Sequence, residues 1–519
     1  MLYISNQQDT KNLKNFIFNQ FDISAVKLMA KAAEGLFHHL NLAVHSFLIL
    51  ANIGNNGGDG FCLAKLISDY DGTKKIHIHI CTDKKTFDTA KTPEVAYYYS
   101  LVKKFRNVTM TFLDDNIEAV ILWTDIIIDC IFGIGYHGKM PPAIAEIIKK
   151  VNESQKYVLA CDIPSGIEND SATIPTIAIK ANKTVTFFTY KSAFINYDII
   201  PYLGKVVVWQ LEFHKQEINR ICTKLIDNNL FYTDSVQLHS RSLISHKGIY
   251  KNLLIFASSL EYLNAGTLVA NMALNAGIGL VIWALSPELL GKTNNTAPEI
   301  TFCDASDRAR ILDLLTNKVN VVAYGMGKGK TERTYNILNY ILDNYKGSIV
   351  VDADGINVLD VSLLRKLRGR AILTPHALEL SRLINKSVPE ILSNRINIAK
   401  EFANKYKIIV VLKGYQSIIT DGNRVYINGT GNPYMAVAGM GDTLTGLIAS
   451  LVGQGYELFE AAIVGTYLHG LAGDEISQYK KPVLPTDIID QIGFVLAELI
   501  GSDDSLNFKN SYFDYFDNF

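Results

Sequence analysis

The sequence has few cysteines and no pattern that would link them. Its 519 residues contain six cysteines, at positions 62, 81, 130, 161, 222 and 303, and none of them forms a Cys-x-x-Cys pair. This spacing excludes a disulfide framework and a cysteine-ligated zinc site, and it favours a reducing compartment. The N-terminal stretch MLYISNQQDTKNLKNF also lacks the basic start and apolar run of a secretory signal. We therefore expect a cytoplasmic protein.

The sequence also has almost no net charge. Its 50 Lys and Arg residues oppose 51 Asp and Glu residues, so no overall basic field favours nucleic acid or an anionic membrane. We expect neither partner, and a local basic patch is the alternative. One uncharged run, 262–287, is long enough for a bilayer. Its asparagines and glycines argue against a membrane span. The run instead predicts a buried helix over 265–276, a glycine turn and a buried strand over 279–285.

Composition and length indicate large folded domains. With 48% hydrophobic and 19% charged residues, and with 36 glycines and 13 prolines, the chain is neither mostly disordered nor collagen-like. Its length fits two large α/β domains or about three smaller ones.

Short apolar runs alternate with segments of helical period along most of the chain. This alternation predicts βαβ units, in which parallel sheets are covered by helices. The expected strands cover 45–52, 75–81, 125–132, 157–163, 184–188 and 204–213, then 252–258, 279–285, 319–325, 348–354, 371–375 and 407–414. The weak pattern at 213–230 predicts the joint between two domains. The polar and aromatic tail, 502–519, fits either an added strand or a frayed end.

A glycine-rich segment follows the first of these strands. In IGNNGGDGFCLAK, residues 53–65, four glycines and two asparagines precede a helical pattern. A strand, a glycine-rich loop and a helix N-terminus together point backbone N–H groups at an anion. The segment matches neither a Walker A nor a G-x-G-x-x-G motif. It predicts an anion site, and a purely structural turn is the alternative.

Two further strand ends carry side chains with oxygen atoms. DCIFGIGYHGK begins with Asp129, and ACDIPSG contains Asp162 and Ser165. Ligands of open α/β sheets bind outside the carboxyl ends of the strands. Asn56, Asp129 and Ser165 are therefore candidate ligands of a hard cation such as K⁺, Na⁺ or Mg²⁺. For each aspartate taken singly, helix capping is the alternative.

In these motifs, and in TVTFFTYK at 184–191, the first half resembles the NAD(P)H-hydrate epimerase domain over residues 1–217. The resemblance implies a Rossmann-like three-layer α/β fold, with K⁺ held by Asn56, Asp129 and Ser165. It implies that Asp162 and Lys191 invert C6 of a hydrated nicotinamide, with a surface lysine as the alternative for Lys191. The implied substrate contacts are Asn55, Asn56, Gly57, Gly58, Asp59, Gly133, Ile134, Gly135, Tyr136, His137, Gly138, Lys139 and Asp162. The chain departs from the family pattern at Ala30, Ala33 and Asn52, where glutamate, glycine and glycine are usual.

The most specific pattern of the second half is NGTGNPYMAVAGMGDTLTGLIASLVGQG, residues 428–455. Gly439, Gly441 and Asp442 open an apolar helix, whose N-terminal N–H groups can stabilise phosphate charge. Beside them, Asp442 can accept a proton from a hydroxyl group that attacks phosphorus. The alternative role for this aspartate is a helix cap.

Other strand ends in this half add candidate ligands. VVLKGYQSIITDG predicts a strand, a turn and a strand, and the turn from Lys413 to Ser417 offers a cation and backbone groups near a phosphate. Asp352 and Asp354 follow another strand and are candidates for Mg²⁺ or ribose, with helix capping the commoner use. His376 follows a third strand at the same edge, where a structural role is the alternative.

These motifs, together with AGTLVANMALNAGIGLV and YLHGLAGD, resemble the ADP/ATP-dependent NAD(P)H-hydrate dehydratase domain over residues 226–505. The resemblance implies a ribokinase-like α/β fold, Asp442 as the catalytic base, Mg²⁺, and ADP or ATP as the phosphoryl donor. The implied substrate contacts are Ala265, Gly327, His376 and Asp442. The implied nucleotide contacts are Lys413, Gly414, Tyr415, Gln416, Ser417 and Gly441. Residues 506–519 are left as a C-terminal tail.

We therefore predict an enzyme with two activities on NADHX and NADPHX, the water adducts of reduced nicotinamide cofactors. One activity interconverts the R and S epimers, and the other dehydrates the S epimer with the help of a nucleotide. The resemblance also implies self-association. One alternative is a ribokinase-like small-molecule kinase that stops at the phosphoester. Another is a first half that serves only as a non-catalytic ligand-binding or scaffold domain.

Overall fold

The chain folds into two compact units that meet in sequence at residues 228 and 229. This position falls within the stretch 213–230, where the sequence pattern is weak. The predicted tail, 506–519, lies outside the described residues. In this computed structural model the described residues are 1–170, 176–226, 228–241, 244–293 and 296–501.

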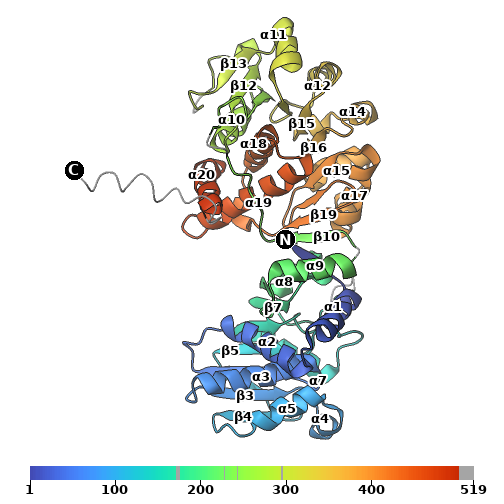
Figure 1. Ribbon diagram of the computed structural model, residues 1–519, viewed down its shortest axis with the longest axis vertical. Coiled ribbons are helices and arrows are strands. Elements are labelled where there is room, and N and C mark those ends of the chain that lie inside the picture. The colour runs from blue at the N-terminus through green and yellow to red at the C-terminus, as the bar shows by residue number, and fades with distance from the viewer. Residues whose placement is uncertain (171–175, 227, 242–243, 294–295, 502–519) are drawn as a thin grey trace, which may run out of the picture. The chain divides into compact units, whose positions relative to one another are not determined.

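The first unit is built on a parallel sheet in the order β4-β3-β2-β5-β6-β7-β9, and strand β1 pairs in parallel with β8. Figure 1 labels β3, β4, β5 and β7 of this sheet. The central strands are buried on both faces, which is why they appear in the sequence as unbroken apolar runs. Edge strand β4 is half-exposed and was not predicted. The strands are β1 (Leu2–Ser5), β2 (Ser46–Ala51), β3 (Lys75–Ile80), β4 (Val108–Phe112), β5 (Ile126–Cys130), β6 (Tyr157–Cys161), β7 (Lys183–Phe187), β8 (Tyr190–Lys191) and β9 (Lys205–Trp209).

Helices cover both faces of this sheet. Apolar side chains of α1, α2, α3, α5 and α9 share one core with β2 and β3, whereas α6 and α7 pack on the opposite face. These three layers confirm the predicted Rossmann-like arrangement. The helices are α1 (Gln7–Phe21), α2 (Ala25–His38), α3 (Asn55–Tyr70), α4 (Lys84–Ala90), α5 (Pro93–Val102), α6 (Glu118–Trp123), α7 (Pro142–Glu153), η1 (Ser192–Ile195), α8 (Ile200–Leu203) and α9 (Lys215–Leu225).

The second unit contains a mixed sheet in the order β13-β12-β11-β14-β15-β16-β17-β18-β19-β10. The strands from β13 to β17 are parallel, as predicted, but β18 runs antiparallel to both of its neighbours. The turn after β17 is too short for the crossover that a parallel neighbour requires. The strands are β10 (Leu230–Thr233), β11 (Asn252–Phe256), β12 (Leu280–Leu285), β13 (Thr301–Asp304), β14 (Val321–Tyr324), β15 (Ser348–Val351), β16 (Ala371–Leu373), β17 (Ile409–Leu412), β18 (Ile418–Thr420) and β19 (Val425–Asn428).

Helices also cover both faces of the second sheet. Helices α10, α18 and α19 pack on one face, with α20 outside them, and α11, α12, α14, α15 and α17 pack on the other. The helices are α10 (Ala265–Asn275), η2 (Pro287–Leu289), α11 (Arg308–Asp313), η3 (Leu314–Lys318), α12 (Glu332–Asn344), α13 (Asp354–Asn357), α14 (Val361–Lys366), α15 (Ala377–Ile384), α16 (Val388–Ser393), α17 (Arg395–Tyr406), η4 (Pro433–Met435), α18 (Met440–Gly453), α19 (Leu458–Ile476) and α20 (Pro485–Gly501).

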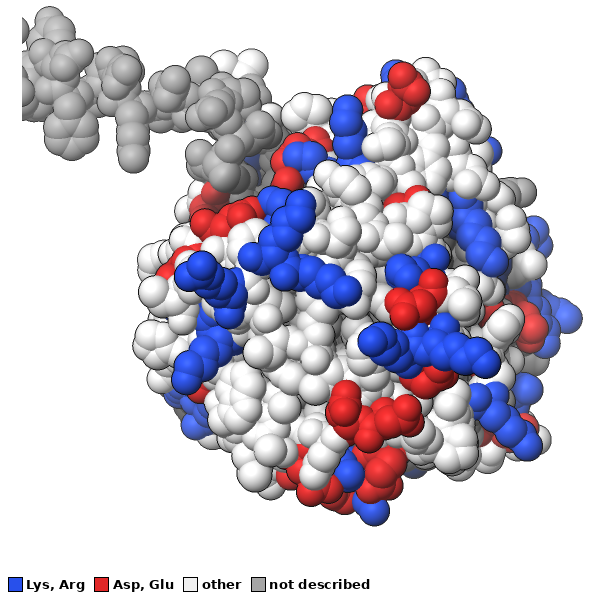
Figure 2. Space-filling view, turned by 90° about the horizontal axis from the view of Figure 1, so that it is seen from below, with Lys and Arg blue, Asp and Glu red and all other residues white. Residues whose placement is uncertain are grey.

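The long uncharged run forms α10 and β12, as predicted. Within the described ranges, no helix combines the length and the apolar character that a membrane span requires. On the face seen in Figure 2, basic and acidic side chains are interspersed over uncharged surface. That face therefore presents no continuous basic field, in keeping with the net charge of -1.

Candidate functional sites

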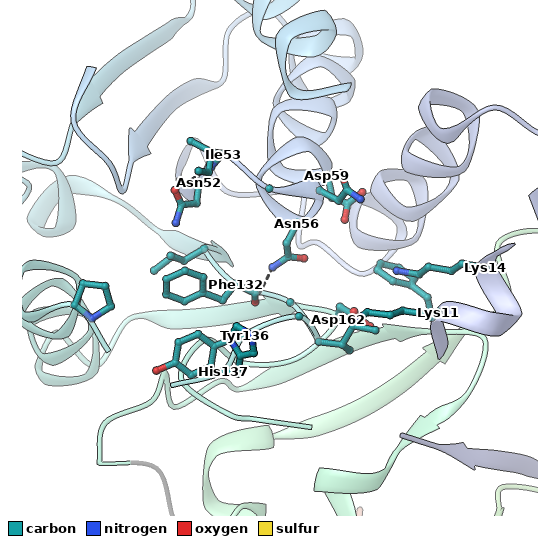
Figure 3. Close-up of a pocket in the computed structure, with 18 of the residues that line it drawn as sticks. Lys11, Lys14, Asn52, Ile53, Asn56, Asp59, Phe132, Tyr136, His137 and Asp162 are labelled. Carbon is teal, nitrogen blue, oxygen red and sulfur yellow. Dashed lines mark hydrogen bonds between the residues drawn. The ribbon is translucent and has the colours of Figure 1, made fainter. Parts of the chain in front are cut away.

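A cavity of about 600 Å³ opens at the carboxyl ends of β2, β5 and β6 (Figure 3). This is the sheet edge at which the sequence predicted a site. The predicted contacts that line it are Asn55, Asn56, Asp59, Gly133, Ile134, Gly135, Tyr136, His137, Lys139 and Asp162. The predicted contacts that do not line it are Gly57, Gly58 and Gly138.

The glycine-rich segment forms the first turns of a helix, not the loop that we predicted. Helix α3 begins at Asn55, and Gly54 precedes it as the cap residue. A Cβ atom at Gly57 would lie 1.9 Å from the carbonyl oxygen of Asn52. Glycine is therefore required there for close packing of the helix on the end of β2. The N–H groups at the start of this helix are suited to stabilise an anion.

Asn56, Asp129 and Ser165 belong to one hydrogen-bonded cluster. The Ser165 hydroxyl donates to Asp129 Oδ1 (2.6 Å), and the Ser165 N–H donates to Oδ2 (2.7 Å). Asn56 Nδ2 donates to the Phe132 carbonyl oxygen (2.9 Å), and the Phe132 N–H donates to Ser165 Oγ (2.9 Å). Burial raises the pKa of Asp129 to about 6. The structure thus brings together the three predicted cation ligands.

The side-chain atoms of Asn56, Asp129 and Ser165 that can coordinate a cation are amide, carboxylate and hydroxyl oxygens. Carboxylate, hydroxyl and carbonyl oxygens suit a hard cation. Among the described residues, no His, Lys or Arg forms an ion pair with the buried Asp129 carboxylate, so a bound cation would supply the missing positive charge. No group of three or more His, Cys, Asp or Glu residues in the described ranges is arranged to hold a metal ion.

Asp162 and Lys191 form a buried pair beside the cavity. Lys191 Nζ lies 3.6 Å from Asp162 Oδ1, which also accepts a hydrogen bond from Thr186 Oγ1 (3.0 Å). Burial lowers the pKa of Lys191 to about 8. Burial opposes the ionisation of Asp162, but the Lys191 and Lys14 cations hold the pKa of this carboxyl below its usual value. Lys191 is fully buried, so the surface alternative is wrong.

Two lysines that sequence reasoning missed also line the cavity. Lys11 and Lys14 lie on α1, and Figure 3 shows them on the same side of the site as Asp162. Asp59 lines the cavity as well, and burial raises the pKa of its carboxyl to about 8. No motif marks the two lysines, because they reach the site only through the packing of α1.

A charged cluster around Lys413 forms the second site. Lys413 Nζ lies 2.7 Å from Asp352 Oδ1 and 4.0 Å from Glu379 Oε2. Thr445 Oγ1 donates to the other oxygen of Asp352 (3.0 Å). A Cβ atom at Gly441 would lie 3.2 Å from both Lys413 Nζ and Asp352 Oδ2. The glycine therefore allows the N-terminus of α18 to pack directly on the ion pair.

Asp442 lies in the first turn of α18 but does not cap it. The N-cap residue is Gly439, with φ of 94°, and the Asp442 side chain makes no capping hydrogen bond. The capping alternative is therefore wrong. Burial, and then the Asp352 carboxylate, raise the pKa of Asp442 to about 7, although the Lys413 cation opposes them. A carboxyl with this pKa can accept a proton near neutral pH.

The turn that follows β17 is held from two sides. The Gly414 N–H donates to Ser417 Oγ (3.3 Å), and the Ser417 hydroxyl donates to the Gly414 carbonyl (3.0 Å). From α17, Arg395 donates to the carbonyl oxygens of Tyr415 and Gln416, each at 3.1 Å. Sequence reasoning missed Arg395, because nothing in its helical pattern links it to the turn.

The predicted contacts Gly327, Ala265 and His376 lie at strand ends and helix starts. A Cβ atom at Gly327, where φ is 65°, would lie 3.0 Å from Ala265 Cβ. The segment that follows β14 therefore packs against the start of α10. His376 caps α15 by accepting backbone hydrogen bonds at Nδ1, so its structural alternative holds. His376 also forms an isolated parallel β-bridge with Lys413, which places it beside the charged cluster. Asp354 accepts a hydrogen bond from the Gly329 N–H (2.8 Å).

Two family models match the chain, one in each unit. The model described as the YjeF-related protein N-terminus matches residues 25–193, and that described as NAD(P)H-hydrate dehydratase matches residues 253–493. The Bifunctional NAD(P)H-hydrate repair enzyme Nnr of Moorella thermoacetica is 30% identical, over 96% of this chain and 97% of its own length. Its counterpart from Escherichia coli is 28% identical, over 91% and 89% respectively.

Solved structures resemble part of the chain. The ADP/ATP-dependent NAD(P)H-hydrate dehydratase from Bacillus subtilis, co-crystallised with ATP and Mg²⁺, is 26% identical to the matched region. The match covers 51% of this chain and 95% of that chain, with a TM-score of 0.47.

Proposed function

This chain belongs to the family of bifunctional NAD(P)H-hydrate repair enzymes, and on that premise we propose how its two sites divide the work. The first unit epimerises NADHX and NADPHX, and the second dehydrates the S epimer with ADP or ATP. One observation carries the proposal: a single chain contains a buried Asp162–Lys191 pair beside a cavity and Asp442 next to the Lys413–Asp352 pair.

In the second unit, Asp442 accepts the proton of the substrate 6-hydroxyl group while that oxygen attacks the terminal phosphorus of the nucleotide. The bond from this phosphorus to the bridging oxygen breaks, so that AMP leaves from ADP, or ADP leaves from ATP. Lys413 and the N–H groups at the start of α18 stabilise the charge on the transferred phosphate. The phosphate then leaves C6 with the electrons of the C–O bond, and a proton leaves C5. The C5–C6 double bond re-forms, because phosphate is a far better leaving group than hydroxide.

In the first unit, Asp162 and Lys191 provide an ionised carboxylate and an ammonium group with a lowered pKa. We assign them to the proton transfers that invert C6. The ring of the substrate occupies the cavity, with contacts to the start of α3 and to the segment that follows β5. We assign K⁺ to Asn56, Asp129 and Ser165, where its charge would balance the buried carboxylate.

For the second unit we propose Mg²⁺, held by Asp352 or Asp354 together with the nucleotide phosphates. When bound, it neutralises the charge of the transferred group. Asp352 is buried and already paired with Lys413, and Asp354 lies just beyond it at the same strand end. We place the enzyme in the cytoplasm, since all six cysteines are free. We also propose that it self-associates, that it binds neither nucleic acid nor membrane, and that its functional domains span 1–217 and 226–505.

An absorbance assay at 340 nm tests both activities at once. Mixed R and S epimers of NADHX, supplied with ADP or ATP, should be converted completely to NADH, with release of inorganic phosphate. Recovery of only the S fraction would overturn the epimerase assignment and favour a non-catalytic first unit. Accumulation of a stable phosphorylated product would instead identify a kinase.

A further inference from the structure

Helix α1 brings two lysines to the cavity of the first unit. Lys11 and Lys14 are one turn apart, so their side chains project from the same side of the helix, and both line the cavity. The helix is fixed in place. The Ser5 hydroxyl forms hydrogen bonds with the hydroxyls of Thr10 on α1 (2.8 Å) and Thr189 (2.6 Å). The backbone of Ser5 also pairs with Lys191 in the β1–β8 ladder.

The charges in this cavity are not balanced without a ligand. Lys11, Lys14 and Lys139 line it, and none of the three forms an ion pair with a residue that the structure describes. The acidic side chains are Asp162, which pairs with Lys191, and Asp59, whose carboxyl is largely neutral near pH 7 because burial raises its pKa to about 8. The cavity therefore has an excess of positive charge on the side formed by α1.

We propose that Lys11 and Lys14 bind a phosphate group of the substrate and so position its ring against Asp162 and Lys191. The inference rests on the proposed epimerase function. Lysine ammonium groups are suited to this task, since they are mobile point charges that bind phosphate oxygens. The substrate has two sources of phosphate, the diphosphate that both adducts share and the 2′-phosphate that only NADPHX carries.

The full-length chain without nucleotide provides a direct test, because no dehydration then follows epimerisation. Interconversion of purified R and S epimers is measured by chromatography for NADHX and for NADPHX. The K11A/K14A double variant should raise KM by about tenfold or more, the loss expected when charge-assisted hydrogen bonds are removed. An increase for both substrates identifies the diphosphate, and an increase for NADPHX alone identifies the 2′-phosphate. Inorganic diphosphate should inhibit the wild type competitively and the double variant more weakly.

Controls separate this inference from the function on which it rests. Lys27→Ala removes an exposed lysine that does not line the cavity, and it should leave KM unchanged. Lys14→Arg keeps the charge and should retain most of the affinity. If the wild type does not interconvert the epimers, the epimerase assignment fails. If the wild type is active and the double variant, still able to dehydrate the S epimer, keeps the wild-type KM, the phosphate-binding role is refuted.

Discussion

The pKa of Asp442 predicts how dehydration depends on pH. If this carboxyl is the base, only its ionised form is active, so kcat/KM for the S epimer must fall as the pH drops below about 7. A single group with that pKa gives roughly a tenth of the plateau rate at pH 6 and roughly nine tenths at pH 8. The rate must fall and not rise at low pH, because burial and Asp352 disfavour the ionised, active form of Asp442 and thereby raise its pKa.

The structure also predicts which neighbouring residue sets the midpoint of the pH–rate profile. Asp352→Asn removes a carboxylate that raises the pKa of Asp442 and frees Lys413, which lowers it. The midpoint should therefore move to lower pH, whatever happens to the height of the plateau. Comparing the variant with the wild type at one nucleotide concentration cancels the titration of the nucleotide itself. The assay is the initial rate at 340 nm with pure S-NADHX.

Two further variants complete this test. Asp442→Asn should reduce the rate by about 10²- to 10⁴-fold, the usual contribution of a positioned base. Asp343→Asn, at an exposed carboxylate paired with Lys366, is the matched control and should not alter the profile. A wild-type profile that is flat between pH 6 and 8, or an Asp352→Asn midpoint that moves upward, would refute the assignment of Asp442 as the base.

Four other outcomes can be checked with the same substrates. Gly57→Ala places a methyl group against the Asn52 carbonyl oxygen, so calorimetry should show the first unit destabilised by about 1–3 kcal/mol or more. Turnover of the R epimer should fall, whereas turnover of the S epimer should persist. Lys191→Met should abolish interconversion of the epimers without changing dehydration, and equal loss of both would contradict its role. Arg395→Ala removes two hydrogen bonds to the turn after β17, so KM for the nucleotide should rise by about tenfold or more while KM for the S epimer changes little. Replacing K⁺ by tetramethylammonium should slow only epimerisation, and Asp129→Asn should remove that dependence on the cation.

The elements that sequence alone predicted are those with strong local patterns. Parallel strands such as β2 and β5 are buried on both faces and appear as unbroken apolar runs. Edge strand β4 and helix α9 were missed, since a half-exposed edge leaves a weak pattern and α9 lies where the joint was expected. In the second unit the antiparallel course of β18 follows from the short turn before it, which the sequence did contain.

The candidate sites divide in the same way. Residues at the ends of predicted strands, such as Asp129, Asp162 and Asp352, could be found because parallel strands place their carboxyl ends at one edge. Lys14 and Arg395 could not, because each reaches its site from a helix that carries no motif. Their contribution depends on the packing of that helix and on the charges it meets, and neither is encoded in a local pattern.

The departures from the family pattern at Asn52, Ala30 and Ala33 do not argue for an inactive first unit. At the end of β2, Gly57 lies close to backbone atoms of Asn52 and not to its side chain. Any residue at position 52 would present the same backbone atoms. The requirement for glycine therefore falls on position 57. The Asn52 side chain accepts a hydrogen bond from the Ile53 N–H (2.9 Å) and lines the cavity. Ala33 on α2 is fully buried in the hydrophobic core that this helix shares with the sheet, and Ala30 packs against the same core. The Asp162–Lys191 pair is present in a chain that carries all three residues, so these departures do not prevent its formation.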